Sequence, residues 1–150
     1  MKRAAAFLVI AMFAGCNPAP PVPPPPAKTP EPARIRVFHV LVAFKGAERA
    51  LPRVTRSREE AEVLANQILK RARDGEDFKS LMQEFSDDPG KGDYGLVNEG
   101  VRPRGPEIRR AQFVPGFTKV AFALAVGEVG LAPHDPRETP HGFHVIKRIE

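Results

Sequence analysis

Cysteine is almost absent from this sequence of 150 residues, and the only one present is Cys16. A single cysteine excludes an intrachain disulfide and any metal site built from several cysteines. Long apolar runs are missing too. The longest, from Ala4 to Ala14, is about half of the roughly 20 residues that a membrane-spanning helix needs.

The sequence also lacks a strong excess of one charge. It has 23 Lys and Arg against 18 Asp and Glu, a formal charge of +5. Four of these residues, Lys2, Arg3, Lys28 and Glu31, precede Arg34, and the remainder carries 20 basic and 17 acidic residues. No basic run interleaves with aromatic residues, so we expect no nucleic-acid partner.

The first residues have the pattern of an export signal. Lys2 and Arg3 precede the apolar run, as in a secretory signal peptide. Phe13–Cys16 resembles the bacterial lipobox, whose cysteine is lipidated and becomes the first residue of the mature chain. We therefore expect a lipoprotein signal peptide at 1–15 and a lipid anchor on Cys16. The alternative is an ordinary signal peptide with an incidental cysteine.

Proline is concentrated in the segment that follows. Nine of the 17 prolines lie between Pro18 and Pro32, and such a run favours extended polyproline II structure. Cys16 and a Pro-rich tether are thus expected at 16–33, before one folded domain at 34–150. The residue after the cysteine is Asn17 and not Asp, and this resembles an outer-membrane sorting signal. The expected location is the bacterial cell envelope, lipid-anchored in the outer membrane and facing the periplasm.

Hydrophobic patterning predicts an α+β domain. Ser57 and Glu60 form a capping box at a helix start, and Gly75 is a typical helix end. The order of elements favours a small, mainly antiparallel sheet. The expected elements are a strand at 34–44, helices at 57–75 and 77–85, a strand at 94–98, a helix at 117–124 and strands at 129–133 and 142–149. The polar, basic segment 99–115 is expected to be irregular.

Seven short motifs, in order and at suitable spacing, resemble the parvulin family of peptidyl-prolyl cis/trans isomerases over almost all of residues 36–150. The resemblance implies a four-stranded, mainly antiparallel sheet packed with about four helices. The motifs are Phe38–Val42, Gly75–Phe78, Phe85–Pro89, Gly92–Gly95, Ala121–Leu124, Val126–Val129 and Gly142–Ile146.

The resemblance also implies an active site. His39 and His144 match the paired histidines, Asp88 the Cys-or-Asp position, and Thr139 a polar position near the last histidine. We expect these four to be catalytic and the two imidazoles to be hydrogen-bonded to each other. Taken alone, His39 or His144 would more often be a packed core histidine.

The proline-binding pocket implied by the family maps to Phe117 and Phe122. Tyr94 stands where Leu or Met is usual, and Val97 where an aromatic residue is common, so both are expected to bind substrate. Extra residues at 102–116 replace a short turn that ends in methionine, and no methionine is present there. The third wall of the pocket therefore has no assigned residue.

The implied chemistry is rotation about an X-Pro amide, whose barrier of about 18–20 kcal/mol limits some folding reactions. A slot that holds the twisted amide without covalent attack needs no cofactor. The expected function is isomerisation of X-Pro bonds in exported, unfolded polypeptides. The alternatives are a parvulin-like chaperone or adaptor that binds peptide without turnover, and a structural lipoprotein.

Two further clusters contain residue types that can bind anions or metals. The cations Lys45, Arg49, Arg53 and Arg56 share one loop, where they either bind an anionic residue before proline or are merely solvated. The segment from His134 to His144 contains three histidines and Asp135, but their spacing matches no strong metal-ligand pattern. We expect no metal site.

Overall fold

The computed structural model describes residues 30–150. Three predicted features lie wholly or mostly outside the described residues: the signal peptide at 1–15, the lipidation of Cys16 and the Pro-rich tether at 16–33. Within 30–150, no helix combines the length and the apolar character that crossing a bilayer would require.

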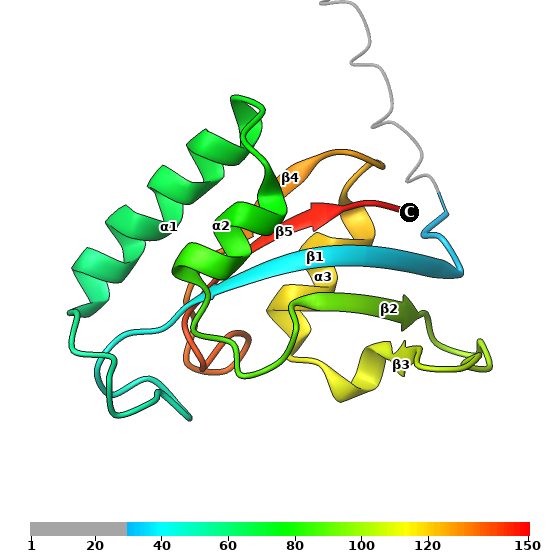
Figure 1. The fold of residues 1–150 in the computed structure, drawn as a ribbon. Coiled ribbons are helices and arrows are strands. Elements are labelled where there is room, and N and C mark those ends of the chain that lie inside the picture. The colour runs from blue at the N-terminus through cyan, green and yellow to red at the C-terminus, as the bar shows by residue number, and fades with distance from the viewer. Residues whose placement is uncertain (1–29) are drawn as a thin grey trace, which may run out of the picture.

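The described chain is an α+β domain with one sheet, as predicted (Figure 1). The strand order is β3-β2-β1-β5-β4, and all neighbours are antiparallel except β2 and β3. The elements are β1 (Arg34–Val42), α1 (Arg58–Arg73), α2 (Phe78–Phe85), β2 (Asp93–Val97), β3 (Ile108–Arg109), the 3₁₀ turn η1 (Arg110–Gln112), α3 (Pro115–Ala123), β4 (Val129–Ala132) and β5 (Phe143–Arg148).

The counts of strands and helices differ from the expectation. The sheet has five strands in place of four, and three α-helices with one 3₁₀ turn replace about four helices. The additional strand, β3, has two residues and pairs with Leu96 and Val97 of β2. A strand so short leaves no alternating pattern in the sequence, so the segment 99–115 was expected to be irregular.

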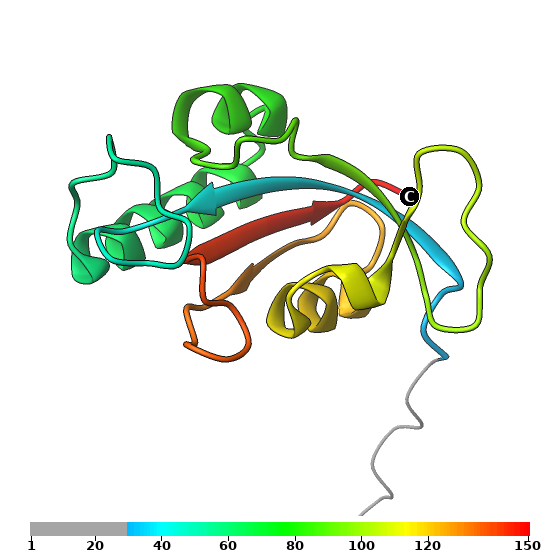
Figure 2. The same cartoon turned by 90° about the horizontal axis from the view of Figure 1, so that it is seen from below.

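The sheet separates two helical layers, with α1 and α2 on one face and α3 on the other (Figure 2). β1 lies at the centre and supplies both cores, because side chains alternate along a strand. Val40 and Val42 pack in the core with α1 and α2, whereas Ile35 and Val37 pack in the core with α3. His39 lies two residues after Val37, on the same face of β1, and therefore faces α3.

Local signals fix the helices that build these layers. The Ser57 hydroxyl accepts a hydrogen bond from the Glu60 amide at 3.2 Å, and the Glu60 carboxylate accepts one from the Ser57 amide at 2.7 Å, which completes the predicted capping box. The buried face of α1 includes Ala61 and Ala65, whose small side chains allow close packing on the sheet. At the start of α2, the Asp77 carboxylate accepts a hydrogen bond from the Ser80 amide at 2.9 Å.

Candidate active site

The two histidines of the predicted pair lie side by side on the α3 face. The register of β1 and β5 sets His39 opposite Ile146 and Leu41 opposite His144, so the imidazoles are diagonal neighbours. Nε2 of His39 is 2.9 Å from Nδ1 of His144, and the rings are 5.0 Å apart and 16° from parallel. The predicted hydrogen bond between them is present, and both residues are buried.

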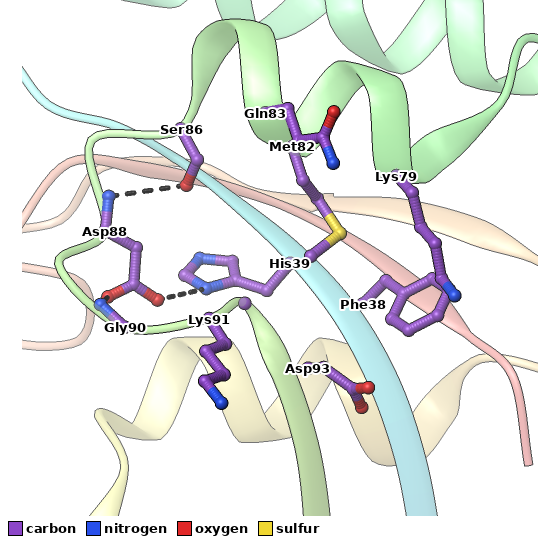
Figure 3. A pocket seen from close by; sticks show the side chains of 11 residues that line it. Phe38, His39, Lys79, Met82, Gln83, Ser86, Asp88, Gly90, Lys91 and Asp93 are labelled. Carbon is purple, nitrogen blue, oxygen red and sulfur yellow. Dashed lines mark hydrogen bonds and ion pairs between the residues drawn. The ribbon is translucent and has the colours of Figure 1, made fainter.

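Asp88 approaches His39 from the loop between α2 and β2. This loop follows the edge of β1: the His39 amide donates to the Gly92 carbonyl at 2.7 Å, and the Asp87 amide donates to the Leu41 carbonyl at 2.8 Å. Gly92 has a φ of 67°, and a Cβ there would lie 2.7 Å from the His39 carbonyl oxygen, so glycine is required. The loop sets Oδ2 of Asp88 3.3 Å from Nδ1 of His39 (Figure 3).

Hydrogen bonds keep the Asp88 carboxyl ionised. The Tyr94 hydroxyl donates to Oδ2 at 2.5 Å, and the Gly90 amide donates to Oδ1 at 2.9 Å. Burial raises the pKa of Asp88, but the contacts with His39, Tyr94 and Gly90 outweigh it and hold that pKa well below its usual range. Burial, followed by the bond to Asp88, raises the pKa of the Tyr94 hydroxyl well above its usual value. At neutral pH the pair is therefore a carboxylate and a neutral phenol.

The same charges define the tautomers of the histidines. Burial, with a smaller contribution from a positive charge on His39, lowers the pKa of His144 well below its usual value, so His144 is neutral. Nδ1 of His39 faces a carboxylate and must carry the hydrogen. In the neutral form of His39, Nε2 is then the acceptor for Nδ1–H of His144. This assignment leaves Nε2 of His144 as a buried acceptor without a protein partner.

Three aromatic rings pack next to the imidazoles. Phe113 stacks on Phe117 at 5.1 Å and meets Tyr94 edge-on at 5.3 Å. Phe117 in turn meets His39 and His144 edge-on, at 5.0 and 5.7 Å. Phe117 is only 1% exposed and does not line the slot itself, so it supports the imidazoles and Phe113 from the core, while Tyr94 and Phe113 form the walls of an aromatic slot.

The slot encloses a cavity of about 160 Å³. That volume is about five times the ~30 Å³ share of one water molecule in the liquid, so the cavity has room for a five-membered pyrrolidine ring. Its lining residues are His39, Leu41, Asp88, Tyr94, Gln112, Phe113, Val114, His141 and His144.

A second cleft of about 370 Å³ opens on the α2 side of the same loop. In Figure 3, Lys79 and Met82 of α2 face this cleft together with Phe38, and Asp88 and His39 lie at its other end. Since Asp88 and His39 line both cavities, solvent can approach the carboxylate from two sides.

Two residues expected to bind substrate lie away from the slot. Phe122 packs in the core below α3 and under the Arg110 guanidinium, 4.7 Å from its ring centroid. Five positions along an α-helix turn a side chain by about 140°, so Phe122 cannot share the direction of Phe117. Val97 is fully buried, and its three-residue separation from Tyr94 places it on the opposite face of β2.

The hydroxyl of Thr139 is engaged by backbone groups of its own loop. Its hydroxyl donates to the Pro133 carbonyl at 2.5 Å and accepts from the Asp135 amide at 2.7 Å, and it forms no hydrogen bond with His39 or His144. Thr139 therefore closes the loop between β4 and β5. A catalytic role for Thr139 stays a prediction.

Sequence reasoning missed five residues that line the slot, namely Leu41, Gln112, Phe113, Val114 and His141. Phe113 supplies the third wall for which no methionine was available, and Gln112 lies next to it. An aromatic residue immediately before the Val114-Pro115 helix start was the available signal. His141 also lines the slot, with Nδ1 3.1 Å from the Glu48 carbonyl oxygen, although we expected no role for it.

The predicted loop cations are only partly available to a ligand. The Arg56 guanidinium is 2.5 Å from the Asp87 carboxylate and donates to the Ala43 carbonyl at 2.9 Å, which engages it in the fold. Lys45 and Arg53 remain exposed. In the described part of the chain, no three His, Cys, Asp or Glu residues gather in a way that could hold a metal ion.

The fold and the arrangement of His39, His144, Asp88 and the aromatic slot define a parvulin-type domain. A family model for the PPIC-type PPIase domain matches residues 26–150. The chain therefore belongs to the PPIC-type peptidyl-prolyl isomerase family.

Individual relatives agree with this assignment. The chain is 32% identical to the foldase protein PrsA of Bacillus subtilis over 120 residues, covering 78% of this chain and 30% of PrsA. It is 34% identical to the chaperone SurA of Chromohalobacter salexigens over 112 residues, covering 75% of this chain and 21% of SurA. The chain thus spans about a quarter of the length of these relatives.

The fold has a solved counterpart in the peptidyl-prolyl isomerase ESS1 from Candida albicans. The two structures superpose with a TM-score of 0.61 at 25% identity, over 79% of this chain and 63% of that one.

Proposed function

We propose that this protein catalyses cis/trans isomerisation of X-Pro bonds in unfolded, exported polypeptides. The observation that carries the proposal is the hydrogen-bonded pair His39–His144 next to an aromatic slot of suitable size. Supporting it, the chain belongs to a family named for peptidyl-prolyl isomerase activity.

The geometry suits rotation rather than covalent attack. Resonance in a planar amide places partial negative charge on the carbonyl oxygen, and it is lost when the bond twists. A slot walled by Tyr94 and Phe113 holds the pyrrolidine ring and excludes the water that would stabilise the charge-separated planar form. The Asp88 carboxylate nearby disfavours negative charge on the carbonyl oxygen, so it also favours the twisted state.

His144 is fixed by its hydrogen bond to His39 and is neutral in this mechanism. A neutral His144 takes up no proton from the substrate, and the reaction requires none. We propose that His39 and His144 act as an oriented polar floor for the twisting amide. Thr139 acts indirectly: a Cβ at Gly116 would lie 2.7 Å from its methyl carbon, so the loop it closes packs directly against the start of α3, which carries Phe117.

The cellular setting follows from the N-terminal sequence. We propose that residues 1–15 are a signal peptide, that Cys16 is lipidated, and that 16–33 tether the domain to the outer membrane of a bacterium, facing the periplasm. The printed names of relatives, a foldase and a chaperone, support work on other polypeptides. Replacement of Cys16 by Ala should move the protein from the membrane to the soluble fraction, and unchanged membrane association would contradict the anchor.

The experiment for the enzyme measures proline-limited refolding of a model protein in the presence of wild type and of three variants. Wild type should accelerate the slow phase, and His144→Ala and Phe117→Leu should lose that acceleration. Phe122→Leu is the matched control, because it alters an equally buried phenylalanine of the same helix that packs under Arg110, whereas Phe117 packs against both imidazoles. It should keep the acceleration while losing similar stability.

A second candidate function is a peptide-binding chaperone or adaptor without turnover, which the name of the SurA relative favours. In that case wild type would suppress aggregation of the refolding protein and leave its slow phase unchanged. A slow phase unaffected by wild type would overturn the enzymatic proposal.

A further inference from the structure

We propose that Tyr94 is a positioning residue of the active site, whose hydroxyl orients the Asp88 carboxylate and thereby sets the tautomers of His39 and His144. The inference rests on the isomerase function proposed above and deepens it. It goes beyond the wall that the Tyr94 ring provides to the slot.

The first support is the set of contacts around the carboxylate. Oδ2 of Asp88 accepts from the Tyr94 hydroxyl at 2.5 Å and faces Nδ1 of His39 at 3.3 Å, while Oδ1 accepts from the Gly90 amide at 2.9 Å. The contact with His39 is longer than a normal hydrogen bond. The Tyr94 hydroxyl is thus the shortest restraint on Oδ2, and with Gly90 it fixes the plane of the carboxylate.

The second support is the space that the loop reserves for this hydroxyl. A Cβ at Gly90 would clash with the Tyr94 hydroxyl oxygen and lie 3.2 Å from Oδ1 of Asp88. Gly90 is not among the glycines with positive φ, so its backbone conformation is open to other residues. Space for the phenol, rather than backbone conformation, therefore requires glycine at this position.

Loss of the hydroxyl has a defined consequence. Without it, the Asp88 carboxylate can turn about its side-chain bond, and Nδ1 of His39 loses the charge that holds a hydrogen there. The opposite tautomer, in which Nε2 of His39 donates to Nδ1 of His144, then becomes populated. Tyr94 thus acts on the histidine pair indirectly, through its hydrogen bond to Asp88 and the contact of Asp88 with His39.

The test uses the Tyr94→Phe variant, which keeps the ring and removes only the hydroxyl. We expect kcat for an X-Pro peptide to fall about tenfold, the size of one hydrogen bond to a charged group, with KM within about twofold. The acid limb of the pH–rate profile should move to higher pH, because the carboxylate loses a donor. ¹⁵N NMR of the imidazoles should report a mixture of tautomers in place of one.

Two further variants make the test specific. Gly90→Ala should reproduce the loss, and the double variant with Tyr94→Phe should lose little more than either single change. Asp88→Asn should likewise abolish the effect of Tyr94→Phe. The other titratable groups around the two cavities are Lys79, Lys91 and Asp93 on the α2 side and His141 on the slot side, and all stay unchanged in these variants.

The positioning role of Tyr94 and the proposed isomerase function can fail independently of each other. The tautomers, and the ¹³C titration of the Asp88 carboxyl, need no turnover, so they test Tyr94 even if wild type does not isomerise. Unchanged tautomers and an unchanged Asp88 titration in Tyr94→Phe would overturn the positioning role. A drop in thermal stability with an unchanged pH profile would show Tyr94 to be merely structural.

Discussion

Asp87 and Asp88 are adjacent in sequence but make different contacts, so replacement by alanine should affect stability at one position and activity at the other. The Asp87 carboxylate accepts from the Ala43 amide at 3.0 Å and from Arg56 at 2.5 Å, so it ties the loop to the end of β1. Asp88 faces the two cavities. We expect Asp87→Ala to lower stability and Asp88→Ala to lower activity.

The magnitudes follow from burial. Ala43 is 2% exposed, so Asp87→Ala leaves its amide without a partner, at about 1–3 kcal/mol. The Arg56 side chain is 29% exposed, and loss of such a pair adds about 1 kcal/mol at most. A total of about 3 kcal/mol corresponds to a Tm lower by roughly 10–15 °C for a domain of this size. Asp88→Ala should destabilise less than Asp87→Ala, because water in the cavities can replace its hydrogen bonds.

The assay is urea unfolding at pH 7 together with isomerase activity at a temperature where both variants stay folded. Asp87→Ala should keep most of its activity there, since the backbone bonds of Asp87 to Leu41 and of His39 to Gly92 still hold the loop. The reasoning is refuted if Asp88→Ala destabilises as much as Asp87→Ala, or if Asp87→Ala leaves the unfolding midpoint unchanged.

Two more predictions concern pH and the tether. The pKa of His144 is lowered in the folded state, so the unfolded chain takes up a proton near pH 6.5 that the folded one refuses; stability should fall below that pH by up to about 1.4 kcal/mol per pH unit for each such group. Burial also lowers the pKa of His134, so His144→Gln should reduce the slope of urea-unfolding free energy between pH 6.5 and 5 without abolishing it, and an unchanged slope would contradict the assignment. Arg110 binds the Glu31 carboxylate and the Asn98 side chain, so Arg110→Ala should expose residues 30–33 to proteolysis at a stability cost below about 1 kcal/mol. Arg53→Ala, at an exposed cation without an ion pair within 30–150, is the control and should leave proteolysis unchanged.

Much of the fold could be predicted because its signals are local. The Ser57–Glu60 capping box and the stop at Gly75 mark α1 from a few adjacent residues. The hydrogen bond of His39 with His144 was also accessible, since the motifs around them implied neighbouring strands. The diagonal register that makes it possible, with Leu41 opposite His144, is a consequence of pairing that no single strand encodes.

The errors share a physical cause: direction and partners depend on tertiary context. Phe117 and Phe122 are both core residues, and only the turn of α3 sets Phe117 against the imidazoles and Phe122 under Arg110. Thr139 has the right chemistry for a polar network, but backbone groups of its own loop engage its hydroxyl. Local hydrogen bonds of this kind are common for Thr and compete with longer-range roles.

The insertion 102–116 was the least predictable part, and it performs two tasks that its polar composition conceals. Its far end delivers Phe113 to the slot, while Glu107 and Arg110 pair with Arg34 and Glu31 where the chain enters the domain. One segment therefore joins the wall of the aromatic slot to the residues that lead into β1. Shortening the insertion to a simple turn would remove both the Phe113 wall and these ion pairs. The insertion departs from the family pattern, because the ring of Phe113 supplies the wall for which the family has a methionine.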